Sequence, residues 1–99
     1  NIGSNKNLKN IEITNELLKI SKKKIQLGKN VKIQFVKDRP GHDFRYAINS
    51  QKIKKSLKWK ASINLDEGLS HTFNWYLNNK KFFNSFSKKT FYKRIGLKI

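Results

Sequence analysis

Two stretches of the chain carry apolar residues at helical spacing. In the first, from about Ile11 to Lys22, apolar positions recur every three or four residues, and a lysine run at 22–24 suits the negative end of a helix. The second and stronger stripe follows Asn64, a suitable N-cap, with Asp66 and Glu67 in the first turn. Its members are Leu65, Leu69, Phe73, Tyr76 and Leu77. We expect this second stripe to form core.

Alternating apolar and polar residues predict extended segments on both sides of residues 38–43. The alternation before them has the pattern of a half-buried strand, with apolar members Val31, Ile33 and Phe35. A briefer alternation after them comprises Phe44, Tyr46 and Ile48. Asn1-Ile2-Gly3 is typical of the tail of a strand that leads into a polar loop. Together with the helices, these segments predict a small mixed α/β unit of the α+β kind.

The other apolar residues fall in shorter elements. Asn49 or Ser50 can cap a short helix with Ile53 and Leu57, and we expect Trp59 to pack as a hydrophobic anchor. From residue 80 onward, lysines interleave with Phe82, Phe83, Phe86, Phe91 and Tyr92. Such interleaving can serve single-stranded nucleic acid, but we favour a tail whose rings lie on the protein body. We therefore divide the chain into a domain, 1–79, and a C-terminal tail, 80–99.

Lysine dominates the charge of the chain. The net charge is +17, and lysine supplies 20 of the 23 basic residues, scattered through every segment. Because a dedicated nucleic-acid surface favours arginine, we attribute much of this charge to a composition also rich in asparagine and isoleucine. We therefore expect no nucleic acid and no membrane as partner, and no apolar run approaches the ~20 residues of a membrane span.

Three other residue types limit the possible functions. The chain has no cysteine, which rules out disulfides and thiolate metal sites, and this is compatible with a reducing cytosol. His71 has no metal-ligating residues nearby in the sequence, so we interpret it as a surface histidine. The chain contains no methionine, which favours a fragment of a longer protein.

Residues 38–46 concentrate residue types that are scarce elsewhere. They contain two of the three arginines, one of the two histidines and the only proline. Arginine offers a planar donor fork to phosphate oxygens, glycine lets the backbone approach a ligand, and proline fixes a turn. An anion-binding loop and a plain solvated turn between two strands both fit this chemistry.

The string Asp-Arg-Pro-Gly-His-Asp-x-Arg-Tyr-Ala-Ile, which begins at Asp38, resembles the substrate loop of dTDP-glucose 4,6-dehydratases, members of the extended short-chain dehydrogenase/reductase family. Upstream, Asn1-Ile2-Gly3 and Asn10 also fit that family. Downstream matches follow in order: Lys52-Ile53, Leu57-x-Trp59-Lys60, Glu67-Gly68-Leu69, Thr72, Trp75-Tyr76-Leu77 and Arg94-Ile95-Gly96-Leu97. The resemblance covers nearly all of this chain, but only the C-terminal part of such an enzyme.

This resemblance implies a fold, a cofactor and an activity. The fold is the substrate-binding portion of an extended short-chain dehydrogenase, with the Rossmann core absent from this chain. NAD would bind to a missing N-terminal domain of a cytoplasmic homodimer that converts dTDP-glucose to dTDP-4-dehydro-6-deoxyglucose. The chain has no glycine-rich dinucleotide fingerprint, Tyr-x-x-x-Lys pair or paired carboxylates, so we expect no catalytic residue here and no activity from the chain alone.

The resemblance also assigns residues to a nucleotide-sugar pocket: Asn10, Asp38, Arg39, Pro40, Gly41, His42 and Tyr46. Arg39 would hold the diphosphate through two charge-assisted hydrogen bonds. His42 would donate to a phosphate oxygen, more strongly when protonated. We expect Asp43 and Arg45 to keep the loop in shape through hydrogen bonds.

Two other functions stay open on the sequence. One is an epimerase or decarboxylase of the same extended family that acts on another nucleotide sugar, although Pro40-Gly41-His42-Asp43 argues against it. The other is a small basic module that binds nucleic acid, which predicts an affinity that falls steeply with salt.

Overall fold

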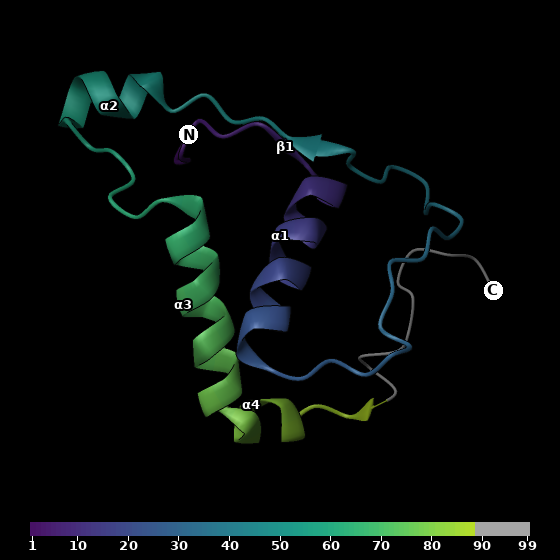
Figure 1. Ribbon diagram of the computed structural model, residues 1–99. Coiled ribbons are helices and arrows are strands. Elements are labelled where there is room, and N and C mark those ends of the chain that lie inside the picture. Colours follow the sequence, from purple (N-terminus) through teal and green to yellow (C-terminus); the bar gives the residue numbers. More distant parts are fainter. Residues whose placement is uncertain (89–99) are drawn as a thin grey trace.

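The computed structural model describes residues 1–88 and contains short strands and four helices in that range. In chain order the elements are β1 (Leu8–Lys9), α1 (Asn10–Lys24), β2 (Arg45–Tyr46), α2 (Gln51–Leu57), α3 (Leu65–Asn78) and α4 (Lys80–Asn84). The longer helices, α1 and α3, lie side by side and run in the same direction (Figure 1). The small mixed helix–strand arrangement expected from the sequence is therefore confirmed.

Helix α1 forms where the first apolar stripe predicts it, and its two ends suit its charges. At its start, Glu12 Oε2 accepts a hydrogen bond of 2.6 Å from the backbone N–H of Lys9, which occupies the N-cap position. The lysines at 22–24 lie in the last turn, where cations interact favourably with the helix dipole. Asn10 is thus the first residue of the helix, which leaves its side chain available for other contacts.

Helix α3 confirms the predicted cap but not the predicted core. Asn64 Oδ1 accepts a hydrogen bond of 2.9 Å from the N–H of Glu67, as the sequence indicates. The stripe is only half-buried, and Tyr76 is 39% exposed. No hydrophobic side chain among residues 1–88 is buried. The radius of gyration is 16.7 Å, against about 13 Å for a compact domain of 100 residues, so the elements are too spread out to enclose a core.

The only sheet in residues 1–88 joins β1 to β2 antiparallel, with Leu8 opposite Tyr46 and Lys9 opposite Arg45. The extended segment expected near residues 44–48 is confirmed at β2. The strands expected at residues 31–35 and at 1–3 are wrong, since both segments are irregular and Phe35 is 85% exposed. A period-two pattern gives a strand only where another strand is there to pair with it.

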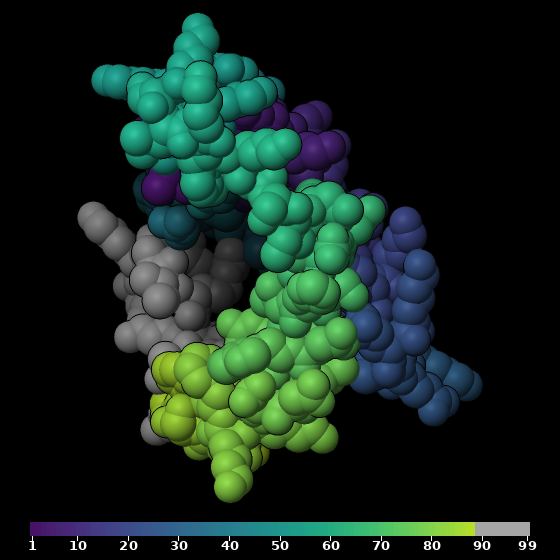
Figure 2. Space-filling view, turned by 90° about the vertical axis from the view of Figure 1, so that its left-hand side faces the viewer, coloured from purple at the N-terminus to yellow at the C-terminus, as the bar shows by residue number. Residues whose placement is uncertain are grey.

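The short helix α2 and the aromatic residues after α3 lie at opposite ends of the face in Figure 2. Ser50 occupies the N-cap position of α2, while Asn49 Oδ1 accepts the N–H of Gln51. Trp59 is 37% exposed, so the prediction that it packs as a hydrophobic anchor is wrong. As with the stripe of α3, the elements are too spread out to enclose it. In α4, the rings of Phe82 and Phe83 contact those of Trp75 and Tyr76 in α3, and the centroids of Trp75 and Phe82 lie 5.3 Å apart.

The predicted division of the chain at residues 79 and 80 stays a prediction. Helix α4 lies in the proposed tail, next to the end of α3. Phe91 and Tyr92, which the sequence interpretation also placed in an aromatic tail, lie outside the described residues.

Candidate anion-binding site

A tight turn shapes the middle of the loop at residues 38–46. Gly41 has a φ of +70°, and the N–H of His42 donates a 3.2 Å hydrogen bond to the carbonyl of Arg39. Proline at the second position and a glycine with positive φ at the third define a type II turn. Pro40 and Gly41 therefore contribute backbone shape, and they present Arg39 and His42 on either side of the turn.

Asn10 joins this loop to the start of α1. Its side-chain Nδ2 donates to the carbonyl of Asp43 and lies 3.3 Å from Nε2 of His42. Its backbone N–H donates to the carbonyl of Phe44 over 3.2 Å. Nε2 of His42 can accept from this amide in the tautomer that carries the imidazole proton on Nδ1. The structure thus brings together residues that lie more than 30 positions apart in the chain.

A groove of about 610 Å³ opens between α1 and the segment that leads into the loop. Its polar lining comprises Asn10, Asp38 and His42 near the loop, together with Thr14, Ser21, Lys32 and Gln34. Its apolar wall includes Leu17, Leu18, Val31, Ile33, Phe35 and Val36. We call it the loop groove. Its volume lies within the range typical of small-molecule pockets, and an apolar wall that also carries polar groups is the usual composition of such pockets.

Four of the seven candidate residues lie outside the lining of the loop groove: Arg39, Pro40, Gly41 and Tyr46. All four are exposed, and Tyr46 lies in β2 opposite Leu8. Asp43 and Arg45 hold the loop through their backbones, because Asp43 accepts from Asn10 and Arg45 pairs with Lys9. The hydrogen bonds expected of these two residues are thus made by their backbone groups.

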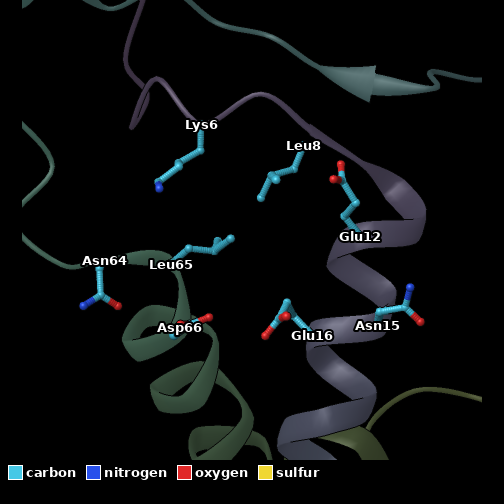
Figure 3. Close-up of a pocket in the computed structure, with 8 residues that line it drawn as sticks. All are labelled: Lys6, Leu8, Glu12, Asn15, Glu16, Asn64, Leu65 and Asp66. Atoms are coloured by element: carbon cyan, nitrogen blue, oxygen red, sulfur yellow. The ribbon is translucent and has the colours of Figure 1, made fainter.

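A second hollow, of about 490 Å³, lies between α1 and α3 (Figure 3). It is lined by the carboxylates of Glu12, Glu16 and Asp66, with the single cation Lys6 above them. We call it the carboxylate hollow. Three carboxylates facing one space repel a phosphate, so this hollow is the wrong place for an anion. The sequence alone did not indicate it, because residues 16 and 66 meet only through the packing of two helices.

The described residues bear on three kinds of site: a metal centre, a membrane span and a dinucleotide loop. Residues 1–88 contain no three His, Cys, Asp or Glu side chains arranged to hold a metal ion together, and His71 is exposed. None of the helices described is long and apolar enough to cross a membrane. The only strand that runs directly into a helix there is β1, and no glycine separates it from α1, so these residues do not fit the pyrophosphate of NAD.

Residues 1–72 match the family model described as GDP-mannose 4,6 dehydratase. A "probable dTDP-glucose 4,6-dehydratase" of Sinorhizobium fredii (strain NBRC 101917 / NGR234) is 38% identical over 98% of this chain and 29% of its own length. A dTDP-glucose 4,6-dehydratase of Escherichia coli is 38% identical over 82% of this chain and 24% of its own.

One from Neisseria meningitidis serogroup B (strain ATCC BAA-335 / MC58) is 50% identical over 48% of this chain. No solved structure matches. The chain spans less than a third of the length of the first two relatives. The match of the family model confirms the resemblance found in the sequence, and the chain belongs to the GDP-mannose 4,6-dehydratase family.

Proposed function

We propose that this chain is the nucleotide-sugar-binding part of a dTDP-glucose 4,6-dehydratase, and that the loop groove and the turn beside it hold the nucleoside diphosphate. The observation that carries the proposal is the contact of Asn10 with His42 and Asp43. It places the start of a 15-residue helix and an imidazole beside one groove. A helix N-terminus and an imidazole N–H both attract phosphate oxygens.

Each candidate residue has a distinct task in this proposal. Arg39 is exposed next to the turn, where its guanidinium can form two parallel hydrogen bonds with a diphosphate. His42 offers a ring N–H, which lies on Nδ1 in the tautomer whose Nε2 accepts from Asn10. The apolar wall of the loop groove accommodates the base or sugar, which removes apolar surface from water. The net charge of +17 raises the rate of encounter with an anionic ligand, and salt weakens this effect.

The catalytic groups belong to other residues of the complete enzyme in this proposal. Its reaction removes water from dTDP-glucose to give dTDP-4-dehydro-6-deoxyglucose, which makes the complete enzyme a lyase. NAD as cofactor, a homodimeric assembly and a cytoplasmic location are further parts of the proposal, and each is implied by the family resemblance. The chain alone is expected to bind the nucleotide portion and to catalyse no reaction.

The test uses the protein translated from the complete reading frame that contains these 99 codons. Its dissociation constant for dTDP is measured by calorimetry, and dehydratase activity is followed through the 4-keto product. Arg39→Ala removes two charge-assisted hydrogen bonds, each contributing about 1.5–3 kcal/mol. We expect dTDP binding to weaken by at least about a hundredfold. Arg39→Lys keeps the positive charge but loses the planar pair of donors. Its dTDP affinity should therefore lie between those of the wild type and Arg39→Ala.

Arg45→Ala is the matched control, since it removes an exposed arginine from the adjacent β2. The site assignment is wrong if Arg39→Ala and Arg45→Ala weaken dTDP binding equally, or if neither changes it. GDP competition is measured in parallel because the family is described by GDP-mannose whereas the relatives are described by dTDP-glucose. A preference for GDP would correct the substrate and leave the site in place.

A further inference from the structure

Ser50 is the only buried polar residue among residues 1–88, with 4% of its surface exposed. Its Oγ lies 2.9 Å from the carbonyl of Gly3 and 2.9 Å from Oδ1 of Asn5, and its backbone N–H donates to the same Oδ1 over 3.0 Å. A hydroxyl has one proton, so two acceptors share the Ser50 donor. Three close polar contacts therefore tie residues 3–5 to the residue that precedes α2.

This contact is one of three that join the same two segments of chain. Residues 3–5 meet Ser50, then β1 pairs with β2, and then Asn10 meets residues 42–44. A ladder of two residue pairs is too short to be stable alone. Ser50 and Asn10 thus hold the ladder at opposite ends.

The backbone near Ser50 is specialised for a close approach. A Cβ on Gly3 would lie 3.3 Å from Cγ2 of Ile48, which is tighter than ordinary contact. Asn5 has a φ of +59°, a left-handed conformation that asparagine tolerates better than most residues. These features fix residues 3–5 in one place against residues 48–50, so they also fix the register of β1 against β2.

The hydroxyl of Ser50 has no part in capping α2, although the residue stands at the N-cap position. Its side chain makes no capping hydrogen bond, and Asn49 Oδ1 accepts the N–H of Gln51 instead. The Ser50 side chain is directed at residues 3–5, and its role concerns that segment.

We propose that Ser50 and Asn5 are positioning residues for the anion site, because they set the register that places Asn10 against the loop. A slip of one residue displaces Asn10 by about 3.3 Å relative to the loop, which separates its amide from His42 and Asp43. This inference rests on the proposed function. It extends the site to residues that touch no ligand and whose loss lowers affinity for a nucleoside diphosphate through Asn10.

The first experiment needs no nucleotide. Hydrogen exchange is measured at the backbone amide of Asn10, which donates to Phe44, in the wild type and in Ser50→Ala. Loss of the hydroxyl contacts is expected to speed this exchange by at least about fivefold. Ser56→Ala removes an exposed serine from α2 and should leave the exchange rate unchanged. Unchanged exchange in Ser50→Ala overturns the proposal, whatever the protein binds.

The second experiment measures dTDP binding in a double-mutant cycle. Ser50→Ala should weaken binding about fivefold in the wild type and have almost no further effect in Asn10→Ala, since Ser50 acts through Asn10. Additive losses would mean a general structural role and contradict the proposal. KM for dTDP-glucose should rise with kcat unchanged, because the register affects binding and not the chemical step.

Variants of Asn5 supply a rescue. Asn5→Gly removes the acceptor while keeping the left-handed backbone accessible, whereas Asn5→Asp keeps an acceptor oxygen. Asn5→Gly should lower dTDP affinity as much as Ser50→Ala does. Asn5→Asp should retain most of the wild-type affinity. If Arg39→Ala weakens dTDP binding but the Ser50 and Asn5 variants do not, the proposed function stands and the positioning role is wrong.

Discussion

Two hollows flank α1, and they differ in the charge that lines them. The loop groove combines an apolar wall with one carboxylate, Asp38, and one lysine, Lys32, whereas the carboxylate hollow is lined by half of the chain's six acidic residues. Both belong to a protein of net charge +17. The comparison teaches that net charge brings an anion to the surface, while the placement of a few carboxylates decides which hollow repels it.

The most direct way to break this comparison is to remove one asparagine from each hollow, since Asn10 lines the loop groove and Asn15 lines the carboxylate hollow. Asn10→Ala loses the amide that reaches Asp43 and His42, and should weaken dTDP binding about tenfold, measured by calorimetry. Asn15→Ala, on the same helix, should leave binding unchanged. Equal effects would show that the two hollows do not differ in anion binding.

A smaller effect on dTDP affinity is expected when Gly28 or Gly41 is replaced by alanine. These two glycines flank the segment that leads into the loop. Gly41→Ala places a Cβ on a residue with φ of +70°, at a cost of about 1–2 kcal/mol, and should lower dTDP affinity by distorting the turn. Gly28→Ala has open space around it and is expected to be neutral or to stabilise slightly. Urea unfolding measures the free energy of unfolding of both variants, and dTDP titration measures their affinity. A tolerated Gly41→Ala would mean that the turn adopts another shape in solution.

The smallest effect on dTDP affinity is expected from substitutions of Asn64, which lines the carboxylate hollow at the start of α3. Asn64→Ala removes the cap of α3 and should lower the free energy of unfolding by about 1 kcal/mol, with dTDP affinity unchanged. Asn64→Asp keeps an acceptor for the N–H of Glu67 and should retain most of the stability. A loss of dTDP affinity in Asn64→Ala would couple the two hollows and make the distinction between them invalid.

Local patterns were sufficient to predict α1, α2 and α3 from the sequence, but not α4, which lies in the predicted tail. Helices α1 and α3 follow from apolar spacing, and the Asn64 cap follows from one residue and the charges after it. The strand expected at residues 31–35 failed because alternation does not provide a pairing partner. The predicted core was wrong because the burial of side chains depends on how the helices and strands pack together, which no local sequence pattern describes.

The candidate site was predicted by resemblance more than by pattern. Composition singled out the loop at residues 38–46, but only the family likeness linked Asn10 to it. The contacts of Asn10 with His42 and Asp43 connect residues too far apart for any periodicity to reveal. Ser50 was missed because a serine before a helix is normally interpreted as a cap, and only its buried contacts with Gly3 and Asn5 indicate otherwise.

The irregular segment between α1 and the loop has a consequence for how such chains change in length. Residues 26–30 precede the wall of the loop groove and have no strand or helix to hold them in register. An insertion there lengthens a tether, and each doubling of tether length costs only about 0.6 kcal/mol. Asn10 and its partners can therefore stay together while this connection varies, so related sequences can differ in length here without loss of the site.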